Sequence, residues 1–455
     1  MSAPGIIIAA PASGSGKTTL TLALLRALRR RGVAVGSFKI GPDYIDPMFH
    51  GRACGRPALN LDPWAMRIET LAGLADQVAE GVDLVLGEGV MGLFDGAADG
   101  RGSTADLASL LDLAVVLVVD ARGMAASAAA LVEGFTRHRD DVEVAGILFN
   151  RVASPEHEAL LRRACDDRFA QPVLGCLPSD PRLALPARHL GLVPAAELPE
   201  LEEFLDRAAE IVGERTDLDR LIRLARPFGL GLYGPPPRPL PPLGQRIALA
   251  MDTAFAFAYP ATLEGWRAAG AEILPFAPLA DQPPDPQADA IYLPGGYPEL
   301  HAGRLAASQR FLAGLRAAAA RGAFLYGECG GYMVLGESLT DAAGARHAMA
   351  GLLPVTTSFA EPRLQLGYRR LKLLERAPLG AAGTTFRGHE FHYASLVESG
   401  DAAPLFEVAD ARGRPLGSLG ARIATVAGSF LHLIDRTEEP GDAVQRSSHL
   451  RRIDP

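Results

Sequence analysis

The sequence predicts an α/β protein of two domains, each a mostly parallel sheet flanked by helices. Three observations support this prediction. The chain has 455 residues, which is enough for two sizeable hydrophobic cores. In both halves, short runs rich in Val, Ile and Leu alternate with helix-length segments, which is typical of parallel strands joined by crossover helices. A proline-rich stretch, YGPPPRPLPPLGQ at 233–245, separates the halves.

The proline-rich stretch sets the predicted boundaries. Its six prolines exclude a regular helix or a central strand, so it is predicted to be an extended linker. We expect a first domain at 1–230, a linker at 231–245, a second domain at 246–440 and a polar tail at 441–455.

Near-continuous apolar runs predict the strands of both domains. In the first domain they are GIIIAA (5–10), VAVGSFKI (33–40), VDLVLGE (82–88), LAVVLVVD (113–120), VEVAGILFN (142–150) and QPVLGCLP (171–178). In the second they are RIALAMD (246–252), AEILPFAP (271–278), DAIYLPGG (289–296), AFLYGEC (323–329) and several β-like runs that end with RIATVAGSFLHLID (422–435).

Composition narrows the class of protein. The chain is 48% hydrophobic and carries a net charge of −8, which argues against a nucleic-acid partner. Its four cysteines lie far apart without a CxxC pair, so we expect a reducing compartment. We find neither a signal peptide nor an apolar run long enough to span a membrane. These features predict a cytoplasmic enzyme without a membrane partner, and a homodimer is one possible assembly.

The N-terminal segment GIIIAAPASGSGKTT (5–19) predicts a phosphate-binding loop between a strand and a helix. Glycines let backbone N–H groups approach phosphate oxygens, a lysine reaches the β- and γ-phosphates, and a hydroxyl can bind Mg²⁺. Pro11 stands where the usual first glycine would be. The predicted ATP-binding residues of the loop are Gly14, Ser15, Gly16, Lys17, Thr18 and Thr19.

Carboxylates are expected beside this loop. Asp43 follows the second apolar run and Glu88 ends the third, so both should lie at the carboxyl edge of the sheet. With Thr18 they are the predicted Mg²⁺ ligands, since Mg²⁺ prefers hard oxygen ligands. Lys39 could neutralise a phosphate or a substrate carboxylate there. The pattern does not rank the further candidates Asp46, Asp95 and Asp120.

A further polar residue, Asn150, ends the fifth apolar run in GILFNRV. A side-chain amide at this edge of the sheet could hydrogen-bond the edge of an adenine ring. Asn150 is therefore a candidate ATP-binding residue.

The stretch LYGECGGYMVL (325–335) predicts a nucleophile elbow that presents Cys329 between a strand and a helix. Gly327 and Gly331 remove side chains that would clash at so sharp a turn. The helix N-terminus is expected to favour the thiolate. Backbone N–H groups at Gly330 and near Gly296 are the predicted oxyanion donors.

A cysteine nucleophile needs a base. His432 follows apolar residues in TVAGSFLHLID (425–435), as expected for a strand-end histidine. His389 and His392, in RGHEFHYAS, are the alternatives, and spacing alone leaves the choice among the three open.

With both sites in view, the chain resembles the cobyrinic or hydrogenobyrinic acid a,c-diamide synthases over nearly its whole length. The motifs that carry the resemblance are KIGPDYIDP, GEGVMGLFDG, LPGGYPELHA, YGECGGYMVLG and GHEFHY. The first half is similar to dethiobiotin-synthetase-like P-loop enzymes. The second is similar to class I glutamine amidotransferases.

The resemblance implies ATP- and glutamine-dependent amidation of the a and c acetates of a corrin ring in cobalamin biosynthesis, with hydrogenobyrinic acid slightly preferred over cobyrinic acid. It implies Cys329 as nucleophile and His432 as base. The substrate residues would be Lys39, Asp43, Tyr44 and Ile45, and the Mg²⁺ ligands Thr18, Asp43 and Glu88.

One departure concerns the residue that orients the base. Many class I glutaminases have a glutamate two positions after the histidine, whereas this chain has Ile434 there and Asp435 next. The alternative functions are a nickel-sirohydrochlorin a,c-diamide synthase, an amidase of cell-wall precursors and a P-loop switch ATPase.

Overall fold

The computed structural model contains two compact units. The residues that it describes are 3–166, 168–188, 191–192, 195–230 and 238–437. The first unit comprises 1–64 and 71–235, and the second comprises 65–70 and 236–455. The predicted tail and the first part of the predicted linker, 231–237, lie outside the described residues.

The first unit is built on an eight-stranded sheet with the order β3-β2-β4-β1-β5-β6-β7, in which these seven strands are parallel. A short strand, β10 (Arg226–Pro227), pairs antiparallel with β1. All six predicted runs form strands, and β3 is an addition. The bounds are β1 (Pro4–Ala9), β2 (Val35–Ile40), β3 (Leu59–Leu61), β4 (Leu84–Glu88), β5 (Ala114–Asp120), β6 (Val144–Val152) and β7 (Val173–Pro178).

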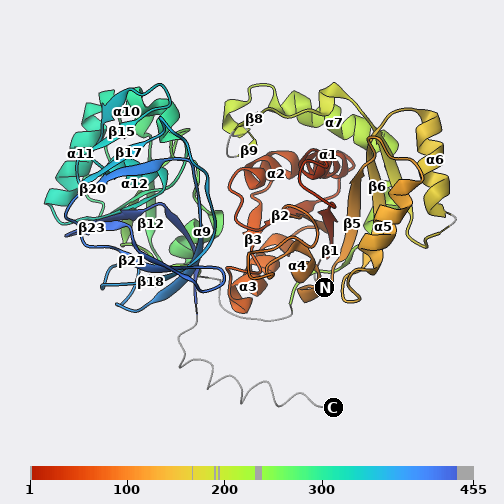
Figure 1. Ribbon diagram of the computed structural model, residues 1–455, viewed down its shortest axis with the longest axis horizontal. Coiled ribbons are helices and arrows are strands. Elements are labelled where there is room, and N and C mark those ends of the chain that lie inside the picture. Colours follow the sequence, from red (N-terminus) through yellow and green to blue (C-terminus); the bar gives the residue numbers. More distant parts are fainter. Residues whose placement is uncertain (1–2, 167, 189–190, 193–194, 231–237, 438–455) are drawn as a thin grey trace, which may run out of the picture. The chain divides into compact units, whose positions relative to one another are not determined.

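Helices lie on both sides of this sheet, with α1 and α7 on one side and α3 and α4 on the other (Figure 1). Their bounds are α1 (Lys17–Arg30), α2 (Asp46–Cys54), α3 (Ile68–Ala79), α4 (Thr104–Leu110), α5 (Ser127–Arg137), α6 (Pro155–Asp166), α7 (Leu201–Arg215) and α8 (Leu218–Arg223). Between β7 and α7 lie two 3-10 turns, Pro181–Leu183 and Ala195–Glu197, and the pair β8 (Ala187–Arg188) and β9 (Gly191–Leu192).

The strand order places the first candidate site. The central strand β1 lies between β4 and β5, so the order of the strands reverses there. A crevice forms at the carboxyl ends of the strands at such a switch point. The turn after β1 and the ends of β2 and β4 therefore meet at one edge of the sheet.

The second unit contains a six-stranded sheet with the order β12-β11-β13-β14-β24-β23, which is parallel except for β23. Its strands are β11 (Arg246–Ala250), β12 (Glu272–Phe276), β13 (Ala290–Leu293), β14 (Phe324–Glu328), β23 (Ala421–Ile423) and β24 (Val426–Ser429). The helices are α9 (Pro260–Ala268), α10 (Ala302–Ala307), α11 (Gln309–Ala320) and α12 (Gly330–Leu335), with 3-10 turns at Pro278–Ala280 and Pro298–His301.

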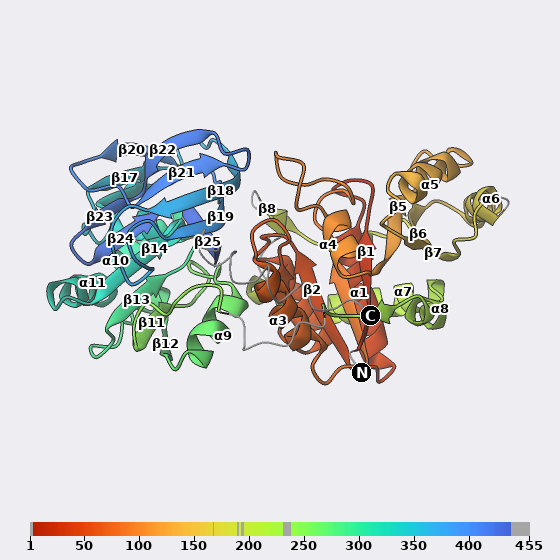
Figure 2. The ribbon, with the colours of Figure 1, turned by 90° about the horizontal axis from the view of Figure 1, so that it is seen from below.

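Two further sheets complete this unit, and the sequence predicts them only as β-like runs. A four-stranded sheet has the order β16-β15-β17-β20, and an antiparallel five-stranded sheet has the order β22-β21-β18-β19-β25 (Figure 2). The bounds are β15 (Ser338–Thr340), β16 (Arg346–Ala348), β17 (Val355–Ser358), β18 (Gln365–Leu373), β19 (Thr385–His392), β20 (Ser395–Ser399), β21 (Phe406–Asp410), β22 (Pro415–Leu419) and β25 (Leu431–Arg436).

The run at 422–435 forms parts of three strands and not a single strand end. Ala424, with φ 51°, lies in the turn between β23 and β24, and Phe430 separates β24 from β25. As a result, β24 belongs to the parallel sheet and β25 to the antiparallel one. Cys329 and His432 are thereby carried by different sheets.

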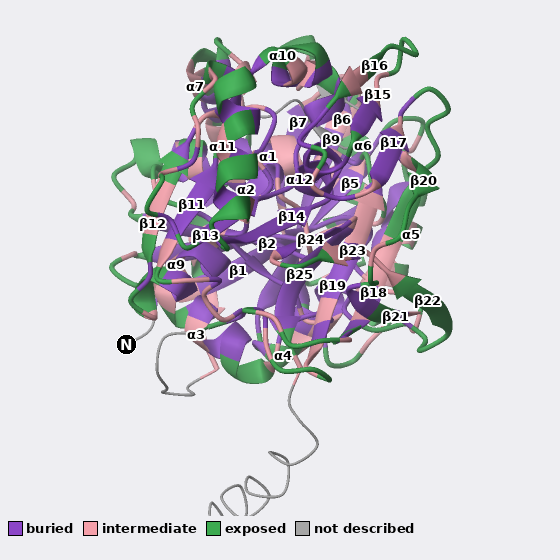
Figure 3. Ribbon diagram, turned by 90° about the vertical axis from the view of Figure 1, so that its left-hand side faces the viewer, coloured by how far each residue is buried: buried purple, intermediate pink, exposed green. Residues whose placement is uncertain are grey.

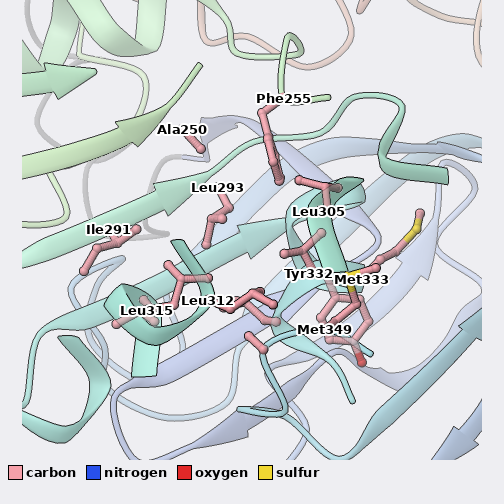
Figure 4. Packing of buried hydrophobic residues seen from close by; sticks show 14 of the residues in the cluster. Ala250, Phe255, Ile291, Leu293, Leu305, Leu312, Leu315, Tyr332, Met333 and Met349 are labelled. Atoms are coloured by element: carbon pink, nitrogen blue, oxygen red, sulfur yellow. The ribbon is translucent and has the colours of Figure 1, made fainter. Parts of the chain in front are cut away.

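The core of the second unit packs α11 and α12 against the parallel sheet. Ile291 and Leu293 from β13 meet Leu312 and Leu315 from α11, and Tyr332 lies in the same cluster (Figure 4). The central strands β13 and β14 are buried, whereas the edge strands β20 and β22 are largely exposed (Figure 3). Among the described helices, none is long and apolar enough to cross a bilayer.

Candidate active sites

The first candidate site is built on the turn after β1. Gly14 (φ 77°) and Gly16 (φ 94°) have positive φ angles, and α1 begins directly at Lys17. The Lys17 ammonium donates to the carbonyl oxygens of Met91 at 2.5 Å and Ala12 at 3.4 Å. Burial, followed by the charge of Lys39, lowers the Lys17 pKa to about 8. Backbone N–H groups and an ammonium that cradle an anion are the chemistry of a phosphate site.

Beside this loop lies a cluster of buried charges. Lys39 lies 2.6 Å from Asp46 and 2.6 Å from Glu88. The Thr18 hydroxyl donates to Glu88 at 2.6 Å and lies 3.3 Å from an Asp46 oxygen. On the other side of Glu88, the His50 ring lies 2.7 Å from its second oxygen. The predicted residues Thr18, Lys39 and Glu88 are therefore in contact.

The charges in this cluster shift one another. Burial opposes a charge on Lys39, but the carboxylates of Asp46, Glu88 and Asp43 outweigh it and raise the Lys39 pKa. Burial likewise opposes ionisation of Glu88, but Lys39 and His50 lower its pKa. Burial and the Asp43 charge raise the pKa of Asp46 to about 7. The ion pair between Lys39 and Glu88 is thus the fixed element of the cluster.

Asp43 and Asp46 differ in what they contact. One Asp43 oxygen accepts the backbone N–H groups of Ile45 at 2.8 Å and Asp46 at 3.0 Å, which stabilises the start of α2. Asp46 is within hydrogen-bond distance of Thr18 and forms an ion pair with Lys39. Sequence reasoning could not rank Asp46, and it missed His50, because the contact depends on how α2 packs against β2.

The other residues predicted at this edge of the sheet differ in their contacts and exposure. The Asn150 amide donates to the Ser15 carbonyl oxygen at 2.9 Å, so in this structure it supports the phosphate loop from β6. Thr19 lies in the first turn of α1. Tyr44 is half-buried, whereas Ile45 is only 4% exposed. Of the two residues proposed to lie near a macrocycle, Tyr44 is the accessible one.

The second candidate site is the turn that carries Cys329. Its φ of 47° and ψ of −101° are strained for a non-glycine residue, as in a nucleophile elbow. A Cβ atom on Gly331 would clash with the carbonyl oxygen of Leu293, and one on Gly327 would lie 2.7 Å from the Gly331 carbonyl carbon. Both glycines are therefore required for the close approach of α12 to the sheet.

The two predicted oxyanion donors lie close together. A Cβ atom on Gly330 would be 3.2 Å from the Gly296 backbone nitrogen and 2.9 Å from Pro298 Cδ. Burial raises the pKa of the Cys329 thiol, and the Gly330 N–H, which bonds the thiol, opposes part of that rise. The two predicted donors are thus neighbours in the structure, as two N–H groups of one oxyanion hole would be.

The structure differs from the expectation of a thiolate favoured by the helix N-terminus. Burial, followed by the charge of Glu299, raises the Cys329 pKa well above its ordinary value. The thiol is therefore neutral in the free protein and needs a base to become a nucleophile.

This raised pKa predicts how Cys329 responds to pH. Without glutamine, its alkylation by iodoacetamide should accelerate about tenfold per pH unit and show no plateau up to pH ~9, because only the thiolate reacts. Mass spectrometry of the Cys329 peptide measures the rate, with Cys329→Ser as the background control. A rate that already levels off near neutral pH would show a stable thiolate instead.

The structure distinguishes the three candidate histidines. His432, on β25, lies directly opposite His389, on β19, and their rings stack at 4.8 Å. The His389 ring lies 2.9 Å from the Tyr259 hydroxyl, and burial, then the His432 and Arg369 charges, lower the His389 pKa well below its ordinary value. His389 is thus a poor proton acceptor, which favours His432 as the base.

The third histidine, His392, is bonded through both ring nitrogens. They contact the Ala394 carbonyl oxygen and the Glu390 carboxylate, each at 2.9 Å, and the ring stacks on Phe430. These contacts indicate a structural role for His392.

The orienting group that the sequence left open has a candidate that sequence reasoning missed. Glu328, the residue before Cys329, lies 3.7 Å from His432 Nδ1. Ile434, by contrast, is apolar and buried. Asp435 forms an ion pair at 2.8 Å with Arg67, which belongs to the same unit. The signal in the sequence that could have identified Glu328 is its position at the end of an apolar run, directly before Cys329.

Comparisons with known proteins match both halves of the chain. Residues 6–193 match the CobQ/CobB/MinD/ParA nucleotide binding domain, and residues 246–439 match the CobB/CobQ-like glutamine amidotransferase domain. These matches agree with the predicted fold class of a P-loop unit followed by a glutamine amidotransferase unit.

Full-length relatives are similar over nearly the whole chain. The hydrogenobyrinate a,c-diamide synthase of Brucella anthropi is 57% identical over 95% of this chain and 98% of its own length. That of Rhizobium meliloti is 54% identical over 95% of this chain and 100% of its own, and that of Rhodobacter capsulatus is 54% identical over 94% and 98%. The chain therefore belongs to the hydrogenobyrinate a,c-diamide synthase family, as its motifs indicated.

Proposed function

We propose that this protein is a ligase that converts the a and c acetate carboxylates of hydrogenobyrinic acid to amides, using ATP and glutamine, in cobalamin biosynthesis. The observation that carries the proposal is the near-complete alignment with diamide synthases at 54–57% identity. The two candidate sites supply the two half-reactions. We also propose that it works in the cytoplasm, where ATP and glutamine are available.

The second unit would release ammonia from glutamine. His432 takes the proton of Cys329, and the sulfur attacks the amide carbon of glutamine. The N–H groups of Gly330 and Gly296 stabilise the oxyanion. His432 then returns the proton to the nitrogen, ammonia leaves, and a thioester remains. Water, deprotonated by His432, hydrolyses the thioester to glutamate and the free thiol.

The first unit would activate the substrate carboxylate. A carboxylate oxygen attacks the γ-phosphorus of ATP, which yields an acyl phosphate and ADP. Ammonia then attacks the acyl carbon, and the amide forms as phosphate leaves. Lys17 and Lys39 neutralise charge on the phosphoryl group and on the carboxylate, and such positioning carries most of the catalysis in phosphoryl transfer.

The residues present fit a bound Mg²⁺. The Thr18 hydroxyl lies 3.3 Å from the Asp46 carboxylate and 2.6 Å from the Glu88 carboxylate, and all three groups are hard oxygen donors. Asp43 remains a proposed ligand through its second oxygen. Bound there, Mg²⁺ would neutralise phosphate charge.

The choice of macrocycle is tested with purified substrates. We expect ATP- and glutamine-dependent diamide formation from hydrogenobyrinic acid, measured by chromatography and mass spectrometry. Cobyrinic acid and nickel-sirohydrochlorin, the substrates of the alternative enzymes, are assayed in parallel. Turnover of either alternative with no turnover of hydrogenobyrinic acid would contradict the assignment.

The order of the two amidations gives a further prediction. One nucleotide site must act on two carboxylates of a large ring, so the monoamide must leave, reorient and rebind. A quenched time course should therefore show free monoamide early in the reaction. Substituting Tyr44 with Ala should change the second amidation relative to the first, since small displacements of a reacting group cost rate steeply. Diamide without released monoamide, even under excess substrate, would instead indicate a processive enzyme.

A further inference from the structure

A buried carboxylate lies next to the nucleophile. Glu328 ends β14 immediately before Cys329 and is 2% exposed. Burying a charge in this way is costly unless hydrogen bonds compensate. Three donors do so: the Tyr292 hydroxyl at 2.8 Å, the Tyr326 hydroxyl at 3.1 Å and the Leu433 backbone N–H at 3.2 Å.

The strand register builds this cradle. Tyr326 and Glu328 are two residues apart on β14, so their side chains lie on the same face of the sheet. Tyr292 is the direct neighbour of Tyr326 on β13, and the two rings stack at 6.0 Å. Gly327, on the opposite face, accommodates α12. The same strand thus carries the elbow on one side and the held carboxylate on the other.

The protonation states of these groups are compatible. Burial, and then the charge of Glu328, raise the pKa of both Tyr292 and Tyr326 well above the ordinary value. The phenols therefore stay protonated and donate to the carboxylate at every pH at which the enzyme would work.

The held carboxylate faces His432. Its Oε2 atom lies 3.7 Å from His432 Nδ1, and the two side chains are 3% and 1% exposed. The Leu433 N–H bonds the same carboxylate, so it fixes the β25 backbone next to the imidazole. At 3.7 Å the contact is too long for a hydrogen bond, but the carboxylate would stabilise the positive charge that the ring acquires when it accepts the thiol proton. On its other face His432 stacks on His389.

We propose that Glu328 is the positioning residue that orients His432 and stabilises its imidazolium. It would do so from the nucleophile strand, where other glutaminases use a residue two positions after the histidine. The inference rests on the proposed roles of Cys329 and His432. It accounts for a buried glutamate with three donors beside the base, and for the apolar Ile434 at the usual position.

The test uses Glu328→Gln in the full-length protein. We expect kcat for glutamine hydrolysis to fall about 10²-fold, with KM for glutamine little changed, since general acid–base assistance is weakened but binding is not. The acid limb of the kcat/KM profile should move to lower pH, because the neutral amide no longer stabilises the imidazolium. Glu328→Asp, which restores the charge, should recover part of the rate.

Amidation with ammonium salts reports folding and the proposed function separately. If the wild type amidates with ammonium and hydrolyses glutamine, the proposed function holds, and Glu328→Gln then tests the positioning role alone. A Glu328→Gln variant with wild-type kcat, or with lower kcat but an unmoved pH profile, would overturn the inference. If the variant also loses ammonium-dependent amidation, the double variant Tyr292→Phe/Tyr326→Phe decides. It keeps the carboxylate but removes two of its donors, so we expect lower kcat, and an unchanged kcat would overturn the inference.

Discussion

Cys329→Ala is expected to abolish glutamine-dependent amidation and to leave amidation with ammonium salts. The proposed nucleophile belongs to the second unit, whereas the phosphate loop and its carboxylates belong to the first. Removing a catalytic nucleophile typically costs on the order of 10⁴-fold or more. The two nitrogen sources are compared under saturating ATP and macrocycle. Cys165→Ala, which removes another buried thiol, is the matched control and should behave like the wild type.

The base is tested in the same assay. His432→Ala should reproduce the loss of glutamine-dependent activity, whereas His389→Ala should retain most of it. His389 bonds Tyr259 and stacks on His432, so its loss should affect the base only indirectly. Equal loss with both nitrogen sources in folded Cys329→Ala would contradict the division of labour. Loss of glutaminase activity in His389→Ala alone would transfer the role of base to His389.

The second large effect is expected at the phosphate loop. Lys17→Ala and Glu88→Gln should each lower amidation by about 10²–10⁴-fold, with either nitrogen source, while glutamine hydrolysis persists. Lys17 supplies a charge for the phosphates, and Glu88 holds Thr18, Lys39 and His50 in place. Two quantities are measured separately: the amide formed on the macrocycle, and the glutamate released from glutamine.

Exposed charges elsewhere provide the control for these variants. Lys372→Ala removes a surface lysine whose ion pair with Glu407 is solvent-exposed, and such pairs contribute little. It should amidate at the wild-type rate. Unchanged amidation in Glu88→Gln would show that this carboxylate does not act in the nucleotide site. Unchanged amidation in Lys17→Ala would contradict the assignment of the loop as the phosphate-binding loop.

Local patterns in the sequence were sufficient to predict the strands of the first unit and the turns that carry the functional side chains. Buried parallel strands form continuous apolar runs, so all six strands predicted for the first unit are present. The phosphate-binding loop after β1 and the nucleophile elbow at Cys329 both depend on glycines within a few residues of the functional side chain. The position of Cys329 could therefore be predicted from its immediate neighbours, and so could the contact of Thr18 with Glu88 at the sheet edge.

The features that depend on long-range packing could not be predicted. The apolar run at 422–435 does not indicate that the chain changes sheet at Phe430, because residues on both sides of Phe430 are apolar. Asp46 and His50 join the charged cluster only because α2 packs against β2. Glu328 comes close to His432 because β14 pairs with β24, about a hundred residues later in the chain, and β25 follows β24 directly. At Cys329, burial raises the thiol pKa and so opposes the thiolate that the helix N-terminus was expected to favour, and burial depends on long-range packing.

The central claim is that this chain transfers glutamine nitrogen to two acetates of hydrogenobyrinic acid at the expense of ATP. The most direct measurement uses glutamine labelled with ¹⁵N at its amide, together with ATP and hydrogenobyrinic acid, followed by mass spectrometry of the corrin. The account predicts a diamide that carries ¹⁵N in both new amides, with one ATP consumed for each. ATP hydrolysis that does not depend on the macrocycle, with no labelled amide formed, would contradict it.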